Sequence, residues 1–347
     1  MSMIEAPQCR ADEGVLALHR GALVFDGLAL KYVLDEPYVG RMRQGGVDAI
    51  NMTIASEKES WDETLDIVAQ SLVKIERNPH LVHARSASEV RAAKAEGRIA
   101  VLFGTQGSAM LDGKLSRLEI LQRLGIRYFG PAYTGATVFA DGCGEFRNAG
   151  LSVIGRELIA LANDLDLIID LSHCGHRSRA EAAELADHPV CTHSNAYAVN
   201  ANDRNTMDDT ARIIAGKGGV VGICGLVKSV WPQGATLEHM LDHLDHFVGR
   251  LGIAHVGLGL DFTEAYQDAL KAGQPRDLSK APKWRRIRPD IFGTVDDFFE
   301  LAYPAGLEGI ALLPNVSHGM RARGYGDADI VAVLGGNWLR QLEESVG

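Results

Sequence analysis

The sequence predicts a single (β/α)8 TIM barrel, an α/β fold in which eight parallel strands alternate with helices. Short apolar runs recur between amphipathic segments along the 347 residues, which is typical of repeated β-α units. Most runs are nearly continuous in Val, Ile, Leu and Gly, as expected for strands covered on both faces. A doubly wound open sheet is the alternative, but no G-x-G-x-x-G phosphate loop follows an early strand. The pattern therefore favours the barrel.

Eight segments have the pattern of buried strands. They are residues 22–30, 47–56, 99–106, 126–133, 167–173, 189–194, 219–226 and 255–262. A long, Pro-containing basic insertion at about 264–293 follows the eighth, and such loops are often lids or binding loops, with a solvated surface loop as the alternative. Residues of about 294–343 have the pattern of two amphipathic helices that close the barrel. We therefore treat 1–347 as one barrel domain.

Composition excludes several classes of function. A formal net charge of −10 leaves little material for a basic face, so we expect no nucleic-acid partner. The five cysteines are scattered without a C-x-x-C pair, which indicates reduced thiols rather than a disulfide framework or a thiolate zinc site. The amino terminus lacks a basic and then apolar leader, and no run of about 18 apolar residues follows. We expect a cytoplasmic protein without membrane association.

The carboxyl ends of the strands carry the functional groups of such barrels. This rule selects Asp26 with the neighbouring Leu28 and Leu30, then Gln106, Tyr133, His173, His193 and Asp261, and Arg204 in the loop after the sixth strand. Neutral imidazoles on adjacent strand ends, here in "DLSHCG" and "CTHSNA", can converge on one metal ion, whereas a lone strand-end His is more often structural. The pair is a candidate metal site.

Several stretches, taken in order, resemble motifs of one family. "LVFDG" resembles an Asp-Gly-His-x-Asp first strand, "LIIDLSH" a fifth strand, "THSNA" a sixth, "DRNTMDD" an Arg-Asn-x-x-Asp segment, "VGLGLDF" an eighth strand and "VLGGNWLR" a terminal Gly-Gly-Asn helix. These are motifs of the renal or membrane dipeptidase family (peptidase family M19) of the amidohydrolase superfamily, and the likeness covers nearly the whole chain. It implies a metal-dependent hydrolase with a small anionic substrate, and a homodimer.

The resemblance also implies a set of site residues, four of which are changed here. In the family a dinuclear zinc site takes His and Asp from the first strand, a bridging Glu from the third, and His from the fifth and sixth. His173 and His193 match the last two. The other positions fall on Leu28, Leu30 and Gln106, and the His that orients substrate falls on Tyr133. Arg204, which would hold the substrate carboxylate, and Asp261, which would handle the proton of the attacking water, are retained.

These departures weaken the expected metal site. Leucine donates nothing to a metal, and Gln106 offers only a neutral carbonyl oxygen. We expect at most one divalent metal, with zinc the expected ion, bound by His173 and His193 with Asp261, Gln106 or water; the alternative is no metal at all. Asp261 and Tyr133 are then the predicted catalytic residues. Arg204, Tyr133, Gln106 and Asp26 are predicted to line the substrate site, and Lys283, Arg285, Arg286 and Arg288 of the insertion to favour an anion.

Three functions remain open, because a fold alone does not determine function. The first is a dipeptidase-like hydrolase of a small carboxylate-bearing amide, with a reduced metal site and weak or absent ordinary dipeptidase activity. The second is different chemistry on the same scaffold, such as a metal-free lyase or isomerase, for which acid-base side chains suffice. The third is a small-molecule-binding protein that keeps Arg204 and the pocket without the reaction.

Overall fold

The computed structural model describes residues 8–273, 283–299 and 303–346. At its centre eight parallel strands follow one another in the order β7-β6-β5-β4-β2-β1-β9-β8, and a parallel bridge between Cys191 and Val221 joins the two ends of this order. The strands are β1 (Phe25–Leu30), β2 (Ala49–Ala55), β4 (Ile99–Thr105), β5 (Ile126–Phe129), β6 (Ile168–Asp170), β7 (Pro189–Val190), β8 (Val221–Ile223) and β9 (Val256–Leu258). Each lies within a predicted strand segment, so the prediction of a (β/α)8 barrel is confirmed.

One short strand was not predicted. β3 (Leu81–His83) pairs in parallel with the first residues of β4, and β5 pairs with the last residues of β4. Three residues are too few for a periodic pattern to be recognised in a sequence. β3 is not one of the eight strands of the barrel, and its His83 ring stacks on Phe103 of β4 with ring centroids 4.2 Å apart.

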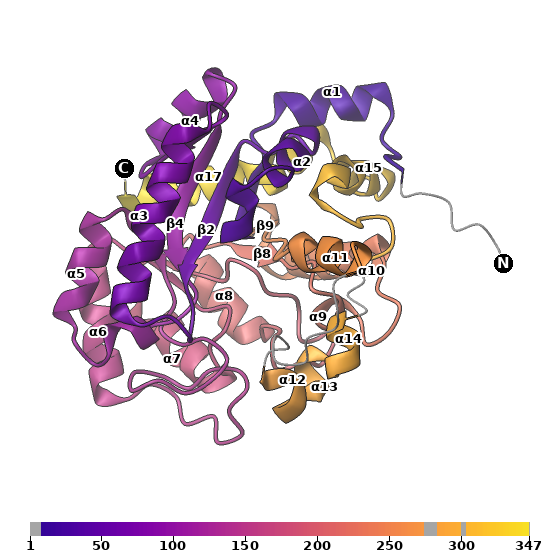
Figure 1. Ribbon diagram of the computed structural model, residues 1–347. Coiled ribbons are helices and arrows are strands. Elements are labelled where there is room, and N and C mark those ends of the chain that lie inside the picture. Colours follow the sequence, from indigo (N-terminus) through magenta and orange to yellow (C-terminus); the bar gives the residue numbers. More distant parts are fainter. Residues whose placement is uncertain (1–7, 274–282, 300–302, 347) are drawn as a thin grey trace.

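Helices connect the strands and cover the outside of the barrel (Figure 1). They are α1 (Glu13–Gly21), α2 (Tyr38–Gln44), α3 (Trp61–Arg77), α4 (Ala87–Ala95), α5 (Ser116–Arg123), α6 (Val153–Asp164), α7 (His176–Leu185), α8 (Asp208–Gly216), α9 (Val227–Val230) and α10 (Leu237–Leu251). Sequence determines their ends locally: Ser60 and Glu63 form a reciprocal capping box at the start of α3. Within the described residues, no helix is both long enough and apolar enough to cross a membrane.

The chain after β9 forms further helices, and four of them, rather than the predicted two, lie in the described residues after 293. The further helices are α11 (Glu264–Lys271), α12 (Trp284–Ile287), α13 (Pro289–Phe292), α14 (Val295–Phe299), α15 (Pro314–Ala322), α16 (Asp327–Val331) and α17 (Asn337–Val346). The first three fall in the predicted insertion, of which residues 274–282 lie outside the described part. Figure 1 shows α12, α13 and α14 grouped at one end of the molecule.

A single large side chain of the last helix, Trp338, packs against the strands of the barrel. Trp338 of α17 is fully buried, and its indole N–H donates to the carbonyl of Leu258 in β9 at 2.9 Å. A Cβ at Gly257 would lie 2.6 Å from the indole nitrogen, and one at Gly27 would lie 2.8 Å from the ring. Glycine at these strand positions therefore leaves the space that the indole occupies.

Candidate functional site

The carboxyl ends of β6 and β7 bring two imidazoles together. The Nε2 atoms of His173 and His193 lie 3.1 Å apart, and both side chains are buried. Burial lowers the pKa of each ring well below its ordinary 6.5, and the positive charge of Arg204 lowers both further. Both rings are therefore neutral near pH 7, the state in which an imidazole can bind a metal or accept a proton.

A buried carboxylate orients the second imidazole. Asp170, the last residue of β6, accepts a hydrogen bond from the Thr192 hydroxyl at 2.6 Å and another from the Thr192 backbone N–H at 2.9 Å. The same hydroxyl oxygen lies 2.7 Å from His193 Nδ1. The Ser172 hydroxyl also donates to Asp170, at 2.5 Å. A carboxylate that positions an imidazole through a hydroxyl fixes the direction of the free ring nitrogen.

Arg204 lies against the first imidazole. Its side chain is almost completely buried, its Nη1 donates to the carbonyl of Ser172, and its Nη2 lies 3.2 Å from His173 Nε2. The Nε atom is buried and has no hydrogen-bond partner. Among the described residues no carboxylate lies within ion-pair distance of this guanidinium. Arg204 is thus a buried cation with an unsatisfied donor, which is costly unless a ligand completes it.

A second buried arginine, Arg179 of α7, holds the two loops that carry the site. Its guanidinium donates to backbone carbonyls on both sides, including Leu171 at 3.1 Å and Cys174 at 2.9 Å in the loop after β6. It also donates to Asn205 at 2.6 Å in the loop that follows β7. The sequence reasoning missed Arg179, Asp170 and Thr192. A signal existed in the polar residues of "DLSH" and "CTH" beside each histidine.

Tyr133 and Asp261 complete the cluster. The Tyr133 ring stacks on His173 with centroids 3.9 Å apart and planes 25° from parallel. Burial, and then the charge of Asp261, raise the pKa of Tyr133, so its hydroxyl stays a hydrogen-bond donor. Burial raises the pKa of Asp261 to about 6, although Arg204 opposes this shift. Asp261 adopts a positive φ of 53°, a conformation that aspartate tolerates better than most residues and that recurs at functional sites.

Asp26 lies at a neighbouring position that the sequence placed in the same site. Its carboxyl accepts the backbone N–H of Leu260 at 2.8 Å and of Leu28 at 3.2 Å. Burial, with a smaller contribution from the charge of Asp261, raises its pKa to about 7, although the two backbone hydrogen bonds oppose this shift. Asp26 lines a narrow pocket between β1, α2 and the start of α11, which leaves room for about one water molecule.

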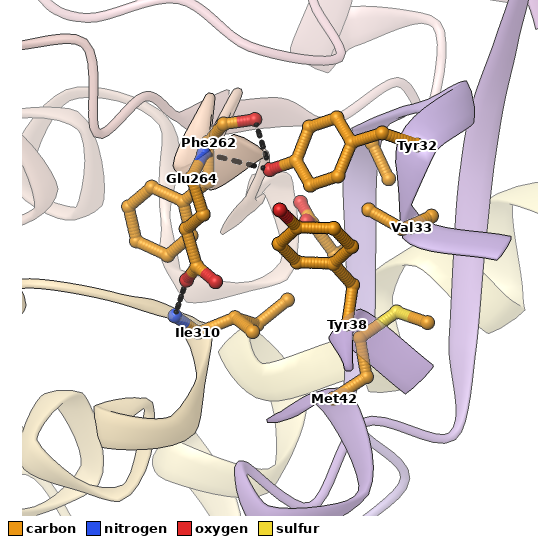
Figure 2. A pocket seen from close by; sticks show the side chains of 9 residues that line it. Tyr32, Val33, Tyr38, Met42, Phe262, Glu264 and Ile310 are labelled. Atoms are coloured by element: carbon orange, nitrogen blue, oxygen red, sulfur yellow. Dashed lines mark hydrogen bonds between the residues drawn. The ribbon is translucent and has the colours of Figure 1, made fainter. Parts of the chain in front are cut away.

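The other walls of this pocket already satisfy their polar atoms (Figure 2). The Tyr32 hydroxyl donates to the carbonyl of Phe262 at 2.8 Å and accepts the backbone N–H of Glu264 at 3.0 Å. The Glu264 carboxylate in turn accepts the backbone N–H of Ile310 and pairs with Arg41 at 3.0 Å. The polar side chains of these walls are therefore already hydrogen-bonded or ion-paired within the chain.

The other predicted site residues, Gln106, Leu28 and Leu30, contact groups other than the imidazole pair. The amide nitrogen of Gln106 donates to the Thr53 hydroxyl in β2 at 2.7 Å. Leu28 is buried in β1, where its carbonyl accepts the backbone N–H of Asp261 at 3.3 Å, and Leu30 is the last residue of that strand. The side chains of Leu28 and Gln106 are buried, and that of Leu30 is half-buried.

Residues 283–293, here called the strap, lie across loops that carry the site. The Trp284 indole is 8% exposed and donates to Glu57 at 2.9 Å. Its ring packs so closely on Gly135 and Gly144 that a Cβ at these positions would lie 2.9 and 2.8 Å from the ring. Arg288 donates to the Gly144 carbonyl at 3.3 Å. The strap therefore contacts the loop that begins at Tyr133.

The basic residues of the strap are largely paired within the chain. Lys283 lies 3.7 Å from Glu57, and Arg288 lies 2.8 Å from Asp203 and 2.6 Å from Asp290. Arg285 donates to the backbone carbonyl of Thr294. These contacts within the chain help to hold the strap in place.

The donor set does not fit a two-metal site. In the described part of the chain, His, Cys, Asp and Glu side chains form no group of three or more that could hold a metal ion. Leu28 and Leu30 have no donor atoms, and a dication on the two imidazoles would lie beside the guanidinium of Arg204. Stable protein metal sites usually have at least three protein ligands and no adjacent cation.

Comparison with known proteins agrees with the fold and the motifs. A family model described as membrane dipeptidase (peptidase family M19) matches residues 35–281. A dipeptidase, tcpJ, of Claviceps purpurea is 28% identical over 75% of this chain and 54% of its own length. An amidohydrolase structure from Pseudomonas aeruginosa superimposes with a TM-score of 0.82 at 25% identity, covering 95% of this chain and 98% of that one. The structure of dipeptidase AC, a metallopeptidase of family M19, gives 0.76 at 25% identity, covering 93% and 98%.

The match extends over most of the barrel, although this chain spans only about half the length of the fungal and yeast relatives it matches. The matched region contains the two histidines, Arg204 and Asp261. On the strength of that match and of the barrel itself, this chain belongs to the membrane dipeptidase family, peptidase family M19, of the amidohydrolase superfamily.

Proposed function

We propose that this chain is a dipeptidase-like hydrolase that recognises the carboxylate of a small amide through Arg204. The observation that carries the proposal is the state of this guanidinium. It is buried, one of its N–H groups has no partner, and no carboxylate among the described residues pairs with it. A ligand carboxylate would supply the missing acceptor and the compensating charge, and carboxylates bind guanidinium groups in a bidentate geometry.

The neighbouring groups suit proton transfer at an amide. Asp261 has a pKa of about 6 and is charged enough near pH 7 to accept a proton from water. The Tyr133 hydroxyl keeps its proton and can donate a hydrogen bond to the oxygen that becomes negative when water attacks the amide carbonyl. Asp261, Arg204 and Tyr133 influence one another electrostatically, which is consistent with one shared site.

The metal content proposed for this hydrolase is at most one divalent ion. Two neutral imidazoles converge at 3.1 Å, and zinc is the ion that such nitrogen donors suit best. The leucines of the first strand provide no second position. Because a hydroxide shared between two metals is a strong nucleophile, its loss should leave ordinary dipeptidase activity weak or absent.

A panel assay tests this proposal. L-Ala-L-Ala, L-Ala-D-Ala, Gly-D-Ala and N-acetyl-L-Ala are incubated with the purified chain with and without added zinc, and the released amino acid is quantified. We expect turnover well below about 10 per second, the median of ordinary enzymes, and only for substrates with a free carboxylate. L-Ala-D-Ala amide, which lacks that carboxylate, is the control substrate. Fast turnover of the panel, or equal turnover of the amide, contradicts the proposal.

Two variants test whether the measured hydrolysis comes from this protein or from a contaminating enzyme. Asp261→Asn keeps the shape of the side chain but removes the base, so it should abolish the measured hydrolysis. Asp209→Asn is the matched control, because the Asp209 side chain is 95% exposed on α8. Hydrolysis that survives in the Asp261 variant would assign the reaction to another group.

A different chemistry on the same scaffold is a second candidate, supported by one observation. Two buried carboxyls, Asp26 and Asp261, have pKa values raised to about 7 and about 6, so each can hold or release a proton near neutral pH. Such a pair suits a lyase or isomerase that moves a proton on carbon. Exchange of substrate C–H for deuterium from D2O, without hydrolysis, would favour this second candidate.

A further inference from the structure

The hydrogen-bond pattern around His193 fixes which of its nitrogens carries the proton. The single hydrogen of the Thr192 hydroxyl goes to the Asp170 carboxylate at 2.6 Å, since a carboxylate can only accept. The hydroxyl oxygen, 2.7 Å from His193 Nδ1, must then accept a hydrogen bond from that nitrogen. His193 therefore has its proton on Nδ1, and its Nε2 lone pair faces His173.

His173 Nε2 lies between this lone pair and Arg204. It is 3.1 Å from His193 Nε2 and 3.2 Å from Arg204 Nη2. With a proton on His173 Nε2, this N–H would donate to the His193 Nε2 lone pair, but it would also face the N–H of Arg204 Nη2 at 3.2 Å. Without that proton, Nε2 accepts from Arg204, and two lone pairs meet at 3.1 Å. Two lone pairs can remain this close when a positive charge lies beside them.

We infer that the Arg204 guanidinium is this positive charge, and that it takes the place of a metal ion at the imidazole pair. The imidazole pair of this chain then binds no divalent metal, and the buried Arg204 guanidinium beside it is the group that receives an anionic ligand. This inference chooses between the alternatives of one metal and none, and it rests on the proposed function only for the carboxylate class of that ligand.

Contacts on the far side of Arg204 hold it in this position. Its Nη1 donates to the Ser172 carbonyl, and its backbone N–H donates to the Asn202 side chain at 2.9 Å. Its own carbonyl accepts from the Ser194 hydroxyl at 3.1 Å and from Arg179 at 3.4 Å. The backbone of Arg204 is therefore fixed by side chains of neighbouring loops, and displacement of the buried guanidinium by a metal ion would cost its bond to the Ser172 carbonyl.

The charge at this site also explains the substitutions in the first strand. A guanidinium carries a single positive charge, so carboxylates that balance two dications are not required around it. Leu28 is buried beside Ala29, and the Leu28 carbonyl accepts the Asp261 N–H at 3.3 Å. The first strand thus needs no metal-binding side chain at Leu28, whose backbone carbonyl contacts Asp261.

Zinc binding to the intact chain tests the inference directly. Wild-type protein and variants are dialysed against about 10 μM zinc chloride, a concentration above trace contamination and below general surface binding. Bound zinc is then measured by elemental analysis and by calorimetric titration. We expect wild type to retain far less than one equivalent. Arg204→Met removes the charge and leaves an unbranched apolar side chain, so it should bind zinc about 10- to 100-fold more tightly, a range typical of changes next to metal ligands.

Two further variants make the comparison specific. Arg204→Lys keeps the positive charge and should remain as poor a zinc binder as wild type. Arg204→Met combined with His173→Gln removes one imidazole and should lose the gain. If Arg204→Met does not fold, the zinc content of wild type and of the Lys variant still decides the question.

The outcomes separate this inference from the proposed function. One tightly held zinc in wild type, or no gain in a folded Arg204→Met variant, overturns the inference. Neither result bears on whether L-Ala-D-Ala is hydrolysed. Absence of hydrolysis together with the expected zinc pattern would contradict the proposed reaction and leave the guanidinium site supported.

Discussion

The Asp26 carboxyl in β1 accepts the backbone N–H of Leu260 at 2.8 Å, which ties the first strand to the chain that leaves β9. Burial raises the pKa of this carboxyl from its ordinary 3.8 to about 7. The folded state thus binds this proton more tightly than the unfolded chain. Its contribution to stability is complete below about pH 4 and is lost as the pH rises through about 7.

Asp26→Asn should therefore remove one component of the pH dependence of stability. The amide oxygen can still accept the Leu260 N–H, but the side chain no longer titrates. We expect the free energy of unfolding of the variant, relative to wild type, to increase between pH 5 and pH 8, at up to roughly 1.4 kcal/mol per pH unit. Urea unfolding of both proteins at four pH values measures this. A constant difference across the range would show that Asp26 is ionised in the folded state.

Arg204→Gln should weaken the binding of carboxylate ligands. A hydrogen bond to a charged group contributes about 1.5 to 3 kcal/mol, and the variant loses the charge while remaining polar. Calorimetry with L-Ala-D-Ala at pH 7 gives the change in affinity. L-Ala-D-Ala amide is the control ligand, which both proteins should bind equally. Equal loss for both ligands would mean that the substitution disturbs the whole pocket.

Arg179→Met should destabilise the chain and loosen both loops of the site. The substitution leaves the buried carbonyls of Leu171, Cys174 and Asn205 without their donor, at about 1 to 3 kcal/mol for each unsatisfied group. Arg177→Ala, two residues earlier on the exposed face of α7, should change stability by only about 0.5 kcal/mol. Urea unfolding compares the two, and similar small losses would assign Arg179 no special part.

Gly144→Ala should dislodge the strap. A Cβ at this position would lie 2.8 Å from the Trp284 ring and 2.7 Å from Thr134, so the indole has to move. Gly216→Ala is the control, because a Cβ there meets nothing within 4 Å. Intrinsic tryptophan fluorescence and amide hydrogen exchange of residues 283–293 should change in the first variant and not in the second. Unchanged exchange in Gly144→Ala would show that the strap tolerates the methyl group.

The strands of the barrel were predictable because each depends on a local property. The runs that became β1, β4 and β9 are apolar enough to be buried on both faces, and that property is present in the sequence before any contact forms. β3 escaped prediction because pairing with the edge of β4, rather than its own three residues, makes it a strand.

The sequence by itself determined which residues reach the mouth of the barrel, since strand order and strand ends place His173, His193, Arg204 and Asp261 there. It also predicted that Leu28 and Leu30 of the first strand occupy positions where the family has metal ligands. Only the tertiary structure decided that Arg204 lies against His173, that Asp170 orients His193 through Thr192, and that Arg179 holds both loops. These contacts join loops from different strands, and their distances depend on how the whole barrel packs, which no local pattern in the sequence encodes.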